Sequence, residues 1–137
     1  PVCNSVGANG ADVCNDAPVI SASGTFIGST TGMVNNYNAG SGGCTGYTTN
    51  GLDVVYQIEL LQGQTVDLTL NRTSSSVDMA LYIVTDCSLM SSCVEGVDGG
   101  NPEELTYTAT SSGTYFIIVD AYTSITPYDF TLNVSVY

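Results

Sequence analysis

The stretch DVVYQIELLQGQTVDLTL, residues 53–70, decides the fold. Its first part, 53–60, alternates apolar and polar residues, and its second part, 64–70, repeats the alternation. Successive side chains of a strand point to opposite faces, so each part presents one apolar stripe. The turn between them contains Gly63, and such a turn between two alternating runs is typical of a β-hairpin. The residues expected to point inward are Val54, Tyr56, Ile58, Leu60, Val66, Leu68 and Leu70.

The same period of two recurs outside this stretch. Clusters of Ser, Gly, Asp and Pro separate the apolar runs, and no segment sustains the 3.6-residue period of a helix. Short alternating strands joined by turns are typical of an antiparallel β-sandwich, and we expect about eight strands. Further strands are predicted at 24–29, 79–84, 105–109, 114–119 and 128–136.

The first fifty residues are different. Residues 1–16 are rich in Gly, Ala and Asn and predict an N-terminal arm or linker, with the sandwich domain over 17–137. Residues 30–50 are rich in Gly, Asn, Ser and Thr and predict a long loop that must be tied down. The chain opens on Pro1, which indicates a removed leader or an excised domain.

The charge balance excludes several classes of function. Thirteen carboxylates face one cationic side chain, Arg72, so neither nucleic acid nor an anionic membrane surface is an expected partner. No apolar run reaches the roughly 18 residues of a membrane span. The chain has no His and no Lys, which removes the commonest general base and amine nucleophile, and we expect no enzyme. An acidic surface attracts cations such as Ca²⁺, or it serves solubility alone.

Five cysteines in a chain of 137 residues indicate an oxidising, extracellular compartment. We expect disulfides between Cys14 and Cys44, which would anchor the long loop, and between Cys87 and Cys93. Cys3 would then be unpaired or intermolecular. Two alternatives stay open: Cys3 pairs with Cys14 and leaves Cys44 free, or Cys3 has its partner outside this chain.

The order of the strand motifs resembles a known family. DVVYQIELLQGQTVDLTL is followed by VDMALYIV (77–84), SGTYFIIVDAY (112–122) and YDFTLNVSV (128–136), and this series resembles the bacterial pre-peptidase C-terminal domain. With the upstream segment VCNDAPVISASGTFIGSTTG (13–32), the resemblance covers about residues 12–137. It implies a jelly-roll-like β-sandwich, appended to secreted bacterial proteins and used without catalysis for binding, targeting, secretion or assembly.

The resemblance also implies a calcium site. The related collagen-binding domains of clostridial collagenases hold Ca²⁺ at an Asn-Asp pair and an Asp at the strand start, matched here by Asn15, Asp16 and Asp53. The chain departs from that pattern at Val13, which replaces a Glu, and at 49–51, which lacks the extra Asp residues. The alternative is structural: Asp16 caps a turn and Asp53 bonds the backbone.

Two further groups are candidates for binding. The acidic turn at 98–103 carries several oxygen ligands but does not fit an EF-hand loop, so we interpret it as a solvated turn. Glu103 and Glu104 are adjacent in an expected strand and should point to opposite faces. Tyrosines can form a stacking surface for sugar or protein, or simply pack in strands. The tyrosines considered are Tyr37, Tyr47, Tyr122 and Tyr128.

Two hypotheses of function follow. In the first, the chain is a non-catalytic secreted module that binds an extracellular polymer, protein or polysaccharide. In the second, it is a structural subunit of an extracellular filament or surface layer, in which residues 1–16 donate a strand to another copy.

Overall fold

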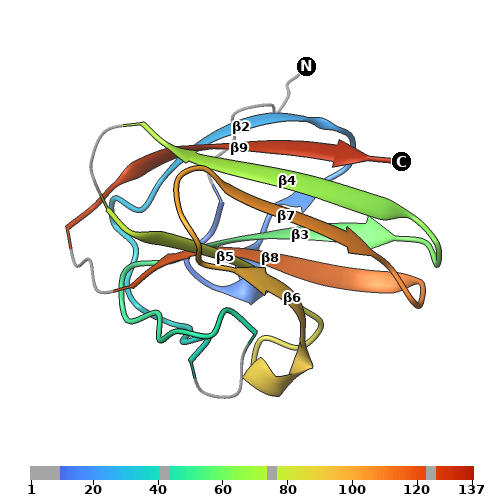
Figure 1. Ribbon diagram of the computed structural model, residues 1–137, viewed down its shortest axis with the longest axis horizontal. Coiled ribbons are helices and arrows are strands. Elements are labelled where there is room, and N and C mark those ends of the chain that lie inside the picture. Colours follow the sequence, from blue (N-terminus) through green and yellow to red (C-terminus); the bar gives the residue numbers. More distant parts are fainter. Residues whose placement is uncertain (1–9, 41–43, 74–76, 123–125) are drawn as a thin grey trace.

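The computed structural model describes residues 10–40, 44–73, 77–122 and 126–137, and within them nine strands form two stacked sheets (Figure 1). Sheet A has the order β1-β3-β8-β5-β6 and sheet B the order β2-β9-β4-β7. Every pairing is antiparallel except that of β1 with β3. The predicted all-β antiparallel sandwich is therefore confirmed.

The strand bounds are as follows. Sheet A contains β1 (Val19–Ile20), β3 (Val54–Leu60), β8 (Gly113–Ala121), β5 (Met79–Val84) and β6 (Cys93–Val97). Sheet B contains β2 (Gly24–Ser29), β9 (Asp129–Val136), β4 (Thr65–Arg72) and β7 (Glu103–Thr108). Two short 3₁₀ turns, η1 (Cys14–Asp16) and η2 (Met90–Ser92), complete the described elements.

The predicted hairpin between residues 53–60 and 64–70 is wrong. β3 pairs with β1 and β8 in sheet A, whereas β4 pairs with β7 and β9 in sheet B. The turn at Leu61–Gln64 crosses from one sheet to the other, and Gly63 adopts a φ of 90° there. The backbone N–H of Gln64 donates to the carbonyl of Leu61 at 2.9 Å, which closes the turn. The two apolar stripes thus face each other across the core, which buries both more completely than a flat hairpin would.

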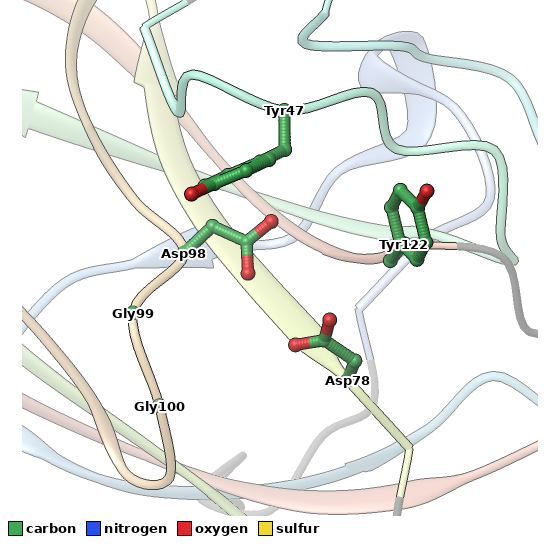
Figure 2. Close-up of a pocket in the computed structure, with 6 residues that line it drawn as sticks. All are labelled: Tyr47, Asp78, Asp98, Gly99, Gly100 and Tyr122. Atoms are coloured by element: carbon green, nitrogen blue, oxygen red, sulfur yellow. The ribbon is translucent and has the colours of Figure 1, made fainter.

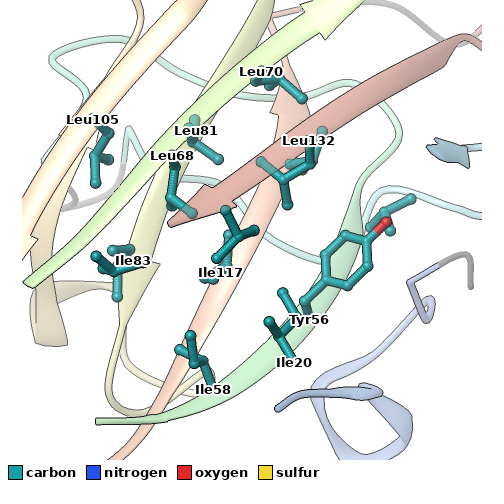
Figure 3. Packing of buried hydrophobic residues seen from close by; sticks show 14 of the residues in the cluster. Ile20, Tyr56, Ile58, Leu68, Leu70, Leu81, Ile83, Leu105, Ile117 and Leu132 are labelled. Atoms are coloured by element: carbon teal, nitrogen blue, oxygen red, sulfur yellow. The ribbon is translucent and has the colours of Figure 1, made fainter. Parts of the chain in front are cut away.

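The core lies between the two sheets (Figure 3). The predicted inward residues of β3 and β4 are all buried, as are Phe130, Leu132 and Val134 of β9. Burying one large apolar side chain contributes roughly 1.5–3 kcal/mol, so this cluster is the main source of stability. Other members of the cluster shown in Figure 3 are Ile20, Leu81, Ile83, Leu105 and Ile117.

The outer face of sheet A is also covered. All six residues of β5 are buried, and a second apolar cluster lies on the side of the sheet away from sheet B. The described segments that cover this face come from residues 10–18 and from the long loop, over 30–40 and 44–52; we call them the covering layer (Figure 1). The second cluster comprises Val55, Tyr82, Val84 and Ile118 of the sheet and Cys14, Ala17 and Ala39 of the covering layer.

The disulfides fasten the covering layer to sheet A. Cys14 bonds to Cys87, and Cys44 bonds to Cys93. The expected pairing, Cys14 with Cys44 and Cys87 with Cys93, is therefore wrong. The reason is that both Cys14 and Cys44 lie over the outer face of sheet A, where the segment after β5 supplies a sulfur to each. Cys3 lies outside the described residues.

The described part of the N-terminal arm contacts its own domain. Ala11 forms a bridge with Val55, and the two backbone N–H···O bonds measure 2.8 and 2.9 Å. Gly10 is buried, and a Cβ placed there would lie 2.2 Å from Cγ1 of Val54. Residues 10–16 are thus part of the covering layer. Strand donation to another copy stays a prediction for residues 1–9, which lie outside the described residues.

Candidate functional site: an acidic pocket between two tyrosines

A pocket of about 370 Å³ opens at the end of sheet A where β5 begins and β8 ends (Figure 2). Asp78 directly precedes β5 and Tyr122 directly follows β8, and the backbone N–H of Tyr122 donates to the carbonyl of Asp78 at 2.9 Å. Asp98 and the two glycines after it follow β6, while Tyr47 comes from the covering layer. Four segments far apart in the sequence therefore build the pocket. Its lining residues are Tyr47, Asp78, Asp98, Gly99, Gly100 and Tyr122.

The covering layer holds Tyr47 in place through its backbone. The N–H of Asn50 donates to the carbonyl of Tyr122 at 2.8 Å, and the N–H of Gly51 donates to that of Ala121 at 2.9 Å. The disulfide from Cys44 to Cys93 fixes the other side of the same segment. The loop that carries Tyr47 is thus anchored on both sides of that residue, which limits the entropy lost when a ligand binds.

Three carboxyl groups meet at the floor of the pocket. Asp78, Asp98 and Glu103 each place a carboxylate oxygen within 4.8 Å of the others, the one such group of three among the described residues. Glu103 is 1% exposed, and its two oxygens accept the N–H groups of Gly99 at 2.8 Å and Gly100 at 3.1 Å. Asp78 and Asp98 instead point into the pocket, as Figure 2 shows.

Burial raises the pKa of Asp98 to about 6, and repulsion by Asp78 and Glu103 adds to the shift. Like charges at this distance disfavour the ionised form of one another. A cation placed between Asp78 and Asp98 would remove that repulsion.

The two tyrosines present their rings beside the carboxylates (Figure 2). Tyr47 is 58% exposed and Tyr122 is 44% exposed. Two of the four tyrosines considered thus line the same pocket, and their use as a stacking surface stays a prediction. Tyr128 is buried and its hydroxyl donates to the carbonyl of Leu52, while Tyr37 is half-buried and its hydroxyl accepts the N–H of Cys14.

The acidic turn at 98–103 is more than a solvated turn, because Glu103 is buried and Asp98 lines the pocket. Glu104 is exposed on the other face of β7, as the alternation predicts. Sequence reasoning missed Asp78, and only its place at the start of an apolar strand hinted that it lies at the edge of the sheet.

The predicted calcium residues have different surroundings. Asn15 and Asp16 are exposed on η1, whereas Asp53 is fully buried. Oδ2 of Asp53 accepts the backbone N–H groups of Asn36 at 2.8 Å and Tyr37 at 2.9 Å, which is the structural alternative considered above. Only Oδ1 of Asp53 is left for an ion, a poor fit to the six to eight oxygens of Ca²⁺. Calcium at this set stays a prediction, and nothing below depends on it.

A second pair of buried carboxyl groups lies beneath the covering layer. Burial raises the pKa of Asp53 to about 7. Burial, followed by repulsion from Asp53, raises the pKa of Asp120 to about 8. Oδ2 of Asp120 accepts a hydrogen bond from the hydroxyl of Tyr82 at 2.6 Å. Oδ1 of Asp53 is buried without a hydrogen-bond partner, and such an unpaired oxygen adds to the cost of ionising the group.

Comparison with solved structures shows the same fold in other proteins, including the two that follow. The pre-peptidase C-terminal domain of collagenase from Bacillus anthracis superimposes with a TM-score of 0.58 at 17% identity, over 86% of this chain and 93% of that one. The periplasmic inhibitor of g-type lysozyme from Aeromonas hydrophila gives a TM-score of 0.56 at 15% identity, over 88% and 98%. At these identities the likeness concerns the fold alone.

No curated protein sequence matches the chain significantly. Among the described residues, no helix has the length and apolar character needed to cross a membrane. The family profile of the bacterial pre-peptidase C-terminal domain matches residues 54–121, from β3 to the end of β8. Together with the shared fold, this match shows that the chain contains a domain of the bacterial pre-peptidase C-terminal family.

Proposed function

We propose that this domain is a non-catalytic binding module of an exported protein, and that it recognises a protein partner through the face around the pocket. The observation that carries the proposal is the pocket itself, where two exposed tyrosine rings flank two carboxylates. Tyrosines are enriched at protein interfaces because the ring buries apolar area and the hydroxyl stays hydrogen-bonded. The anchored loop that carries Tyr47 supports a preformed surface.

The chemistry of the chain supports a role without catalysis. The sequence has no His and no Lys, which removes the commonest general base and the amine nucleophile. The two disulfides suit an oxidising compartment outside the cytoplasm. Among the fold neighbours, one is a periplasmic inhibitor of g-type lysozyme and another is a domain of a collagenase, which supports a protein partner for this domain.

The proposal is tested by retention on immobilised partners. We expect the domain to be retained on a panel of exported proteins that includes fibrillar collagen and a g-type lysozyme, and not on cellulose or chitin. Replacing both Tyr47 and Tyr122 by alanine should weaken binding at least about tenfold, because exposed aromatic anchors dominate interface energies.

Tyr137→Ala is the matched control. Tyr137 is 67% exposed at the end of β9 in sheet B, where its hydroxyl donates to Asp67. This variant should bind as the wild type does. Retention on the polysaccharides alone, or equal losses for Tyr137→Ala and the double variant, would contradict a protein-binding role for this face.

A further inference from the structure

We infer that the pocket receives one cationic side chain, a lysine ammonium or an arginine guanidinium, from a basic segment of the partner protein. This inference rests on the proposed binding function and names the chemistry of the partner. It is carried by three independent features of the pocket: its unbalanced carboxylates, its two aromatic walls and its size.

The negative charge of the pocket is not neutralised by the chain's own side chains. The one Lys or Arg of the sequence is Arg72, whose Nη1 donates to the carbonyl of Val77 at 3.1 Å, and Arg72 does not line the pocket. The amides of the following glycines already satisfy Glu103. Asp78 and Asp98 are therefore the charges that a ligand would meet, and each can accept a hydrogen bond from an N–H donor.

The aromatic walls favour an organic cation over a metal ion. The face of a tyrosine ring attracts an ammonium or guanidinium group and contacts its methylene stem as well. A Ca²⁺ ion instead needs six to eight oxygens, and among the described residues the carboxylates that line the pocket come from two, Asp78 and Asp98. Both tyrosines expose a large part of the ring at the mouth, so a side chain can enter between them.

The size of the pocket agrees with a side chain as the ligand. Its volume of about 370 Å³ is at the low end of the roughly 300–1,000 Å³ of small-ligand sites. That is far more than a bare ion fills. The pocket opens to the surface, so the ligand can remain attached to a protein chain.

The test follows the backbone amide resonances of the ¹⁵N-labelled domain during titration with pentalysine and penta-arginine peptides. We expect saturable shifts at Tyr47, Gly99, Gly100 and Tyr122, with smaller shifts elsewhere. A peptide of five acetyl-lysines, which has the same length without the charge, should produce none. Titration with spermidine tests whether a free polyamine binds the pocket as well. We expect the peptides to bind more tightly than spermidine.

Variants distinguish binding at the pocket from nonspecific attraction of the peptides to the overall negative charge of the protein. Asp78→Asn and Asp98→Asn should each weaken peptide binding roughly threefold to tenfold, as expected for the loss of a charge-assisted hydrogen bond. Glu59→Gln removes the same charge from an exposed site at the opposite end of β3, and it should change the affinity less than about twofold. Tyr122→Leu should weaken binding roughly twofold to fivefold, and Tyr122→Phe should restore it.

Three results would overturn the inference. Equal losses for Glu59→Gln and Asp98→Asn would mean that the peptides sense only the net charge. Binding of the acetylated peptide would remove the role of the cation. Displacement of pentalysine by millimolar CaCl₂, but not by NaCl of equal ionic strength, would make the pocket a metal site.

The experiments distinguish a failure of the cationic-ligand inference from a failure of the proposed binding function. If the domain is retained on a protein through Tyr47 and Tyr122 while the aspartate variants bind that protein normally, only the cationic ligand is wrong. If the peptides bind the pocket but no protein retains the domain, the proposed function is wrong instead. Thermal unfolding of every variant confirms that each remains folded at the temperature of the titration.

Discussion

Replacing both Cys14 and Cys87 by alanine should lower the free energy of unfolding by about 4 kcal/mol. The two cysteines are 73 residues apart, and a crosslink over such a loop removes much of the entropy of the unfolded chain. The loss also frees the segment that begins the covering layer, whose Ala17 is buried on the outer face of sheet A. Urea denaturation of the oxidised proteins, monitored by circular dichroism, gives the difference.

Reduction provides the control for this variant. After full reduction, the wild type and the double variant should unfold at nearly the same urea concentration, because neither then contains the Cys14–Cys87 crosslink. A loss below about 1 kcal/mol in the oxidised double variant would contradict the account, because the chain-entropy model assigns a loop of this length several times as much.

The second large effect is a fall in stability as pH rises from 4 to 8. In the folded protein the pKa values of Asp53 and Asp120 are about 7 and about 8, whereas an aspartate in an unfolded chain titrates near about 3.9. The folded state therefore holds more protons across this window. The stabilisation is fully present below about pH 4 and is lost as pH rises through the folded pKa values, by up to about 1.4 kcal/mol per pH unit for each group.

Asp120→Asn should flatten this dependence. The amide keeps an oxygen to accept a hydrogen bond but cannot ionise, so the variant should gain on the wild type as pH rises. Glu104→Gln removes a charge from an exposed position of β7 and should keep the wild-type slope. Urea denaturation at pH 4, 5, 6, 7 and 8 measures the slope, and a stability that is constant or rises over this range would contradict the buried, protonated pair.

Much of the sandwich could be predicted from the period of two in its strands. Val66, Leu68 and Leu70 are buried where the alternation placed them. The same pattern could not say which strands pair. Alternation shows which side chains face the core, but it does not show whether two successive strands lie in one sheet or in opposite sheets. The turn at Gly63 therefore predicted a hairpin, whereas it joins the two sheets.

The covering layer was the main feature that the sequence concealed. The run MALYIV, residues 79–84, is apolar at every position, and such a run indicates a strand buried on both faces. A strand buried on both faces implies a segment that covers the outer face of its sheet, and the described parts of the long loop, 30–40 and 44–52, help to provide it. The disulfide pairing depends on this cover, since it brings Cys14 and Cys44 beside Cys87 and Cys93.

The sequence indicated several residues of the pocket individually but not that they lie together. Tyr47, Tyr122 and Asp98 were each singled out from the sequence, yet nothing in their spacing indicated that they meet. Their proximity follows from the covering layer, which carries Tyr47 to the end of β8, and from the pairing of β5 with β8, which sets Asp78 beside Tyr122. The calcium set was taken from a resemblance, and its residues have different degrees of burial here.

A single tryptic cut tests the central claim, that two disulfides fasten the covering layer to sheet A. Arg72 is the one Lys or Arg in the chain, so trypsin divides the denatured protein into 1–72 and 73–137. After free thiols are alkylated without reduction, the structure predicts one mass in which Cys14–Cys87 and Cys44–Cys93 join the two halves. Two separate fragments before reduction, as a Cys14–Cys44 and Cys87–Cys93 pairing would give, would contradict the account.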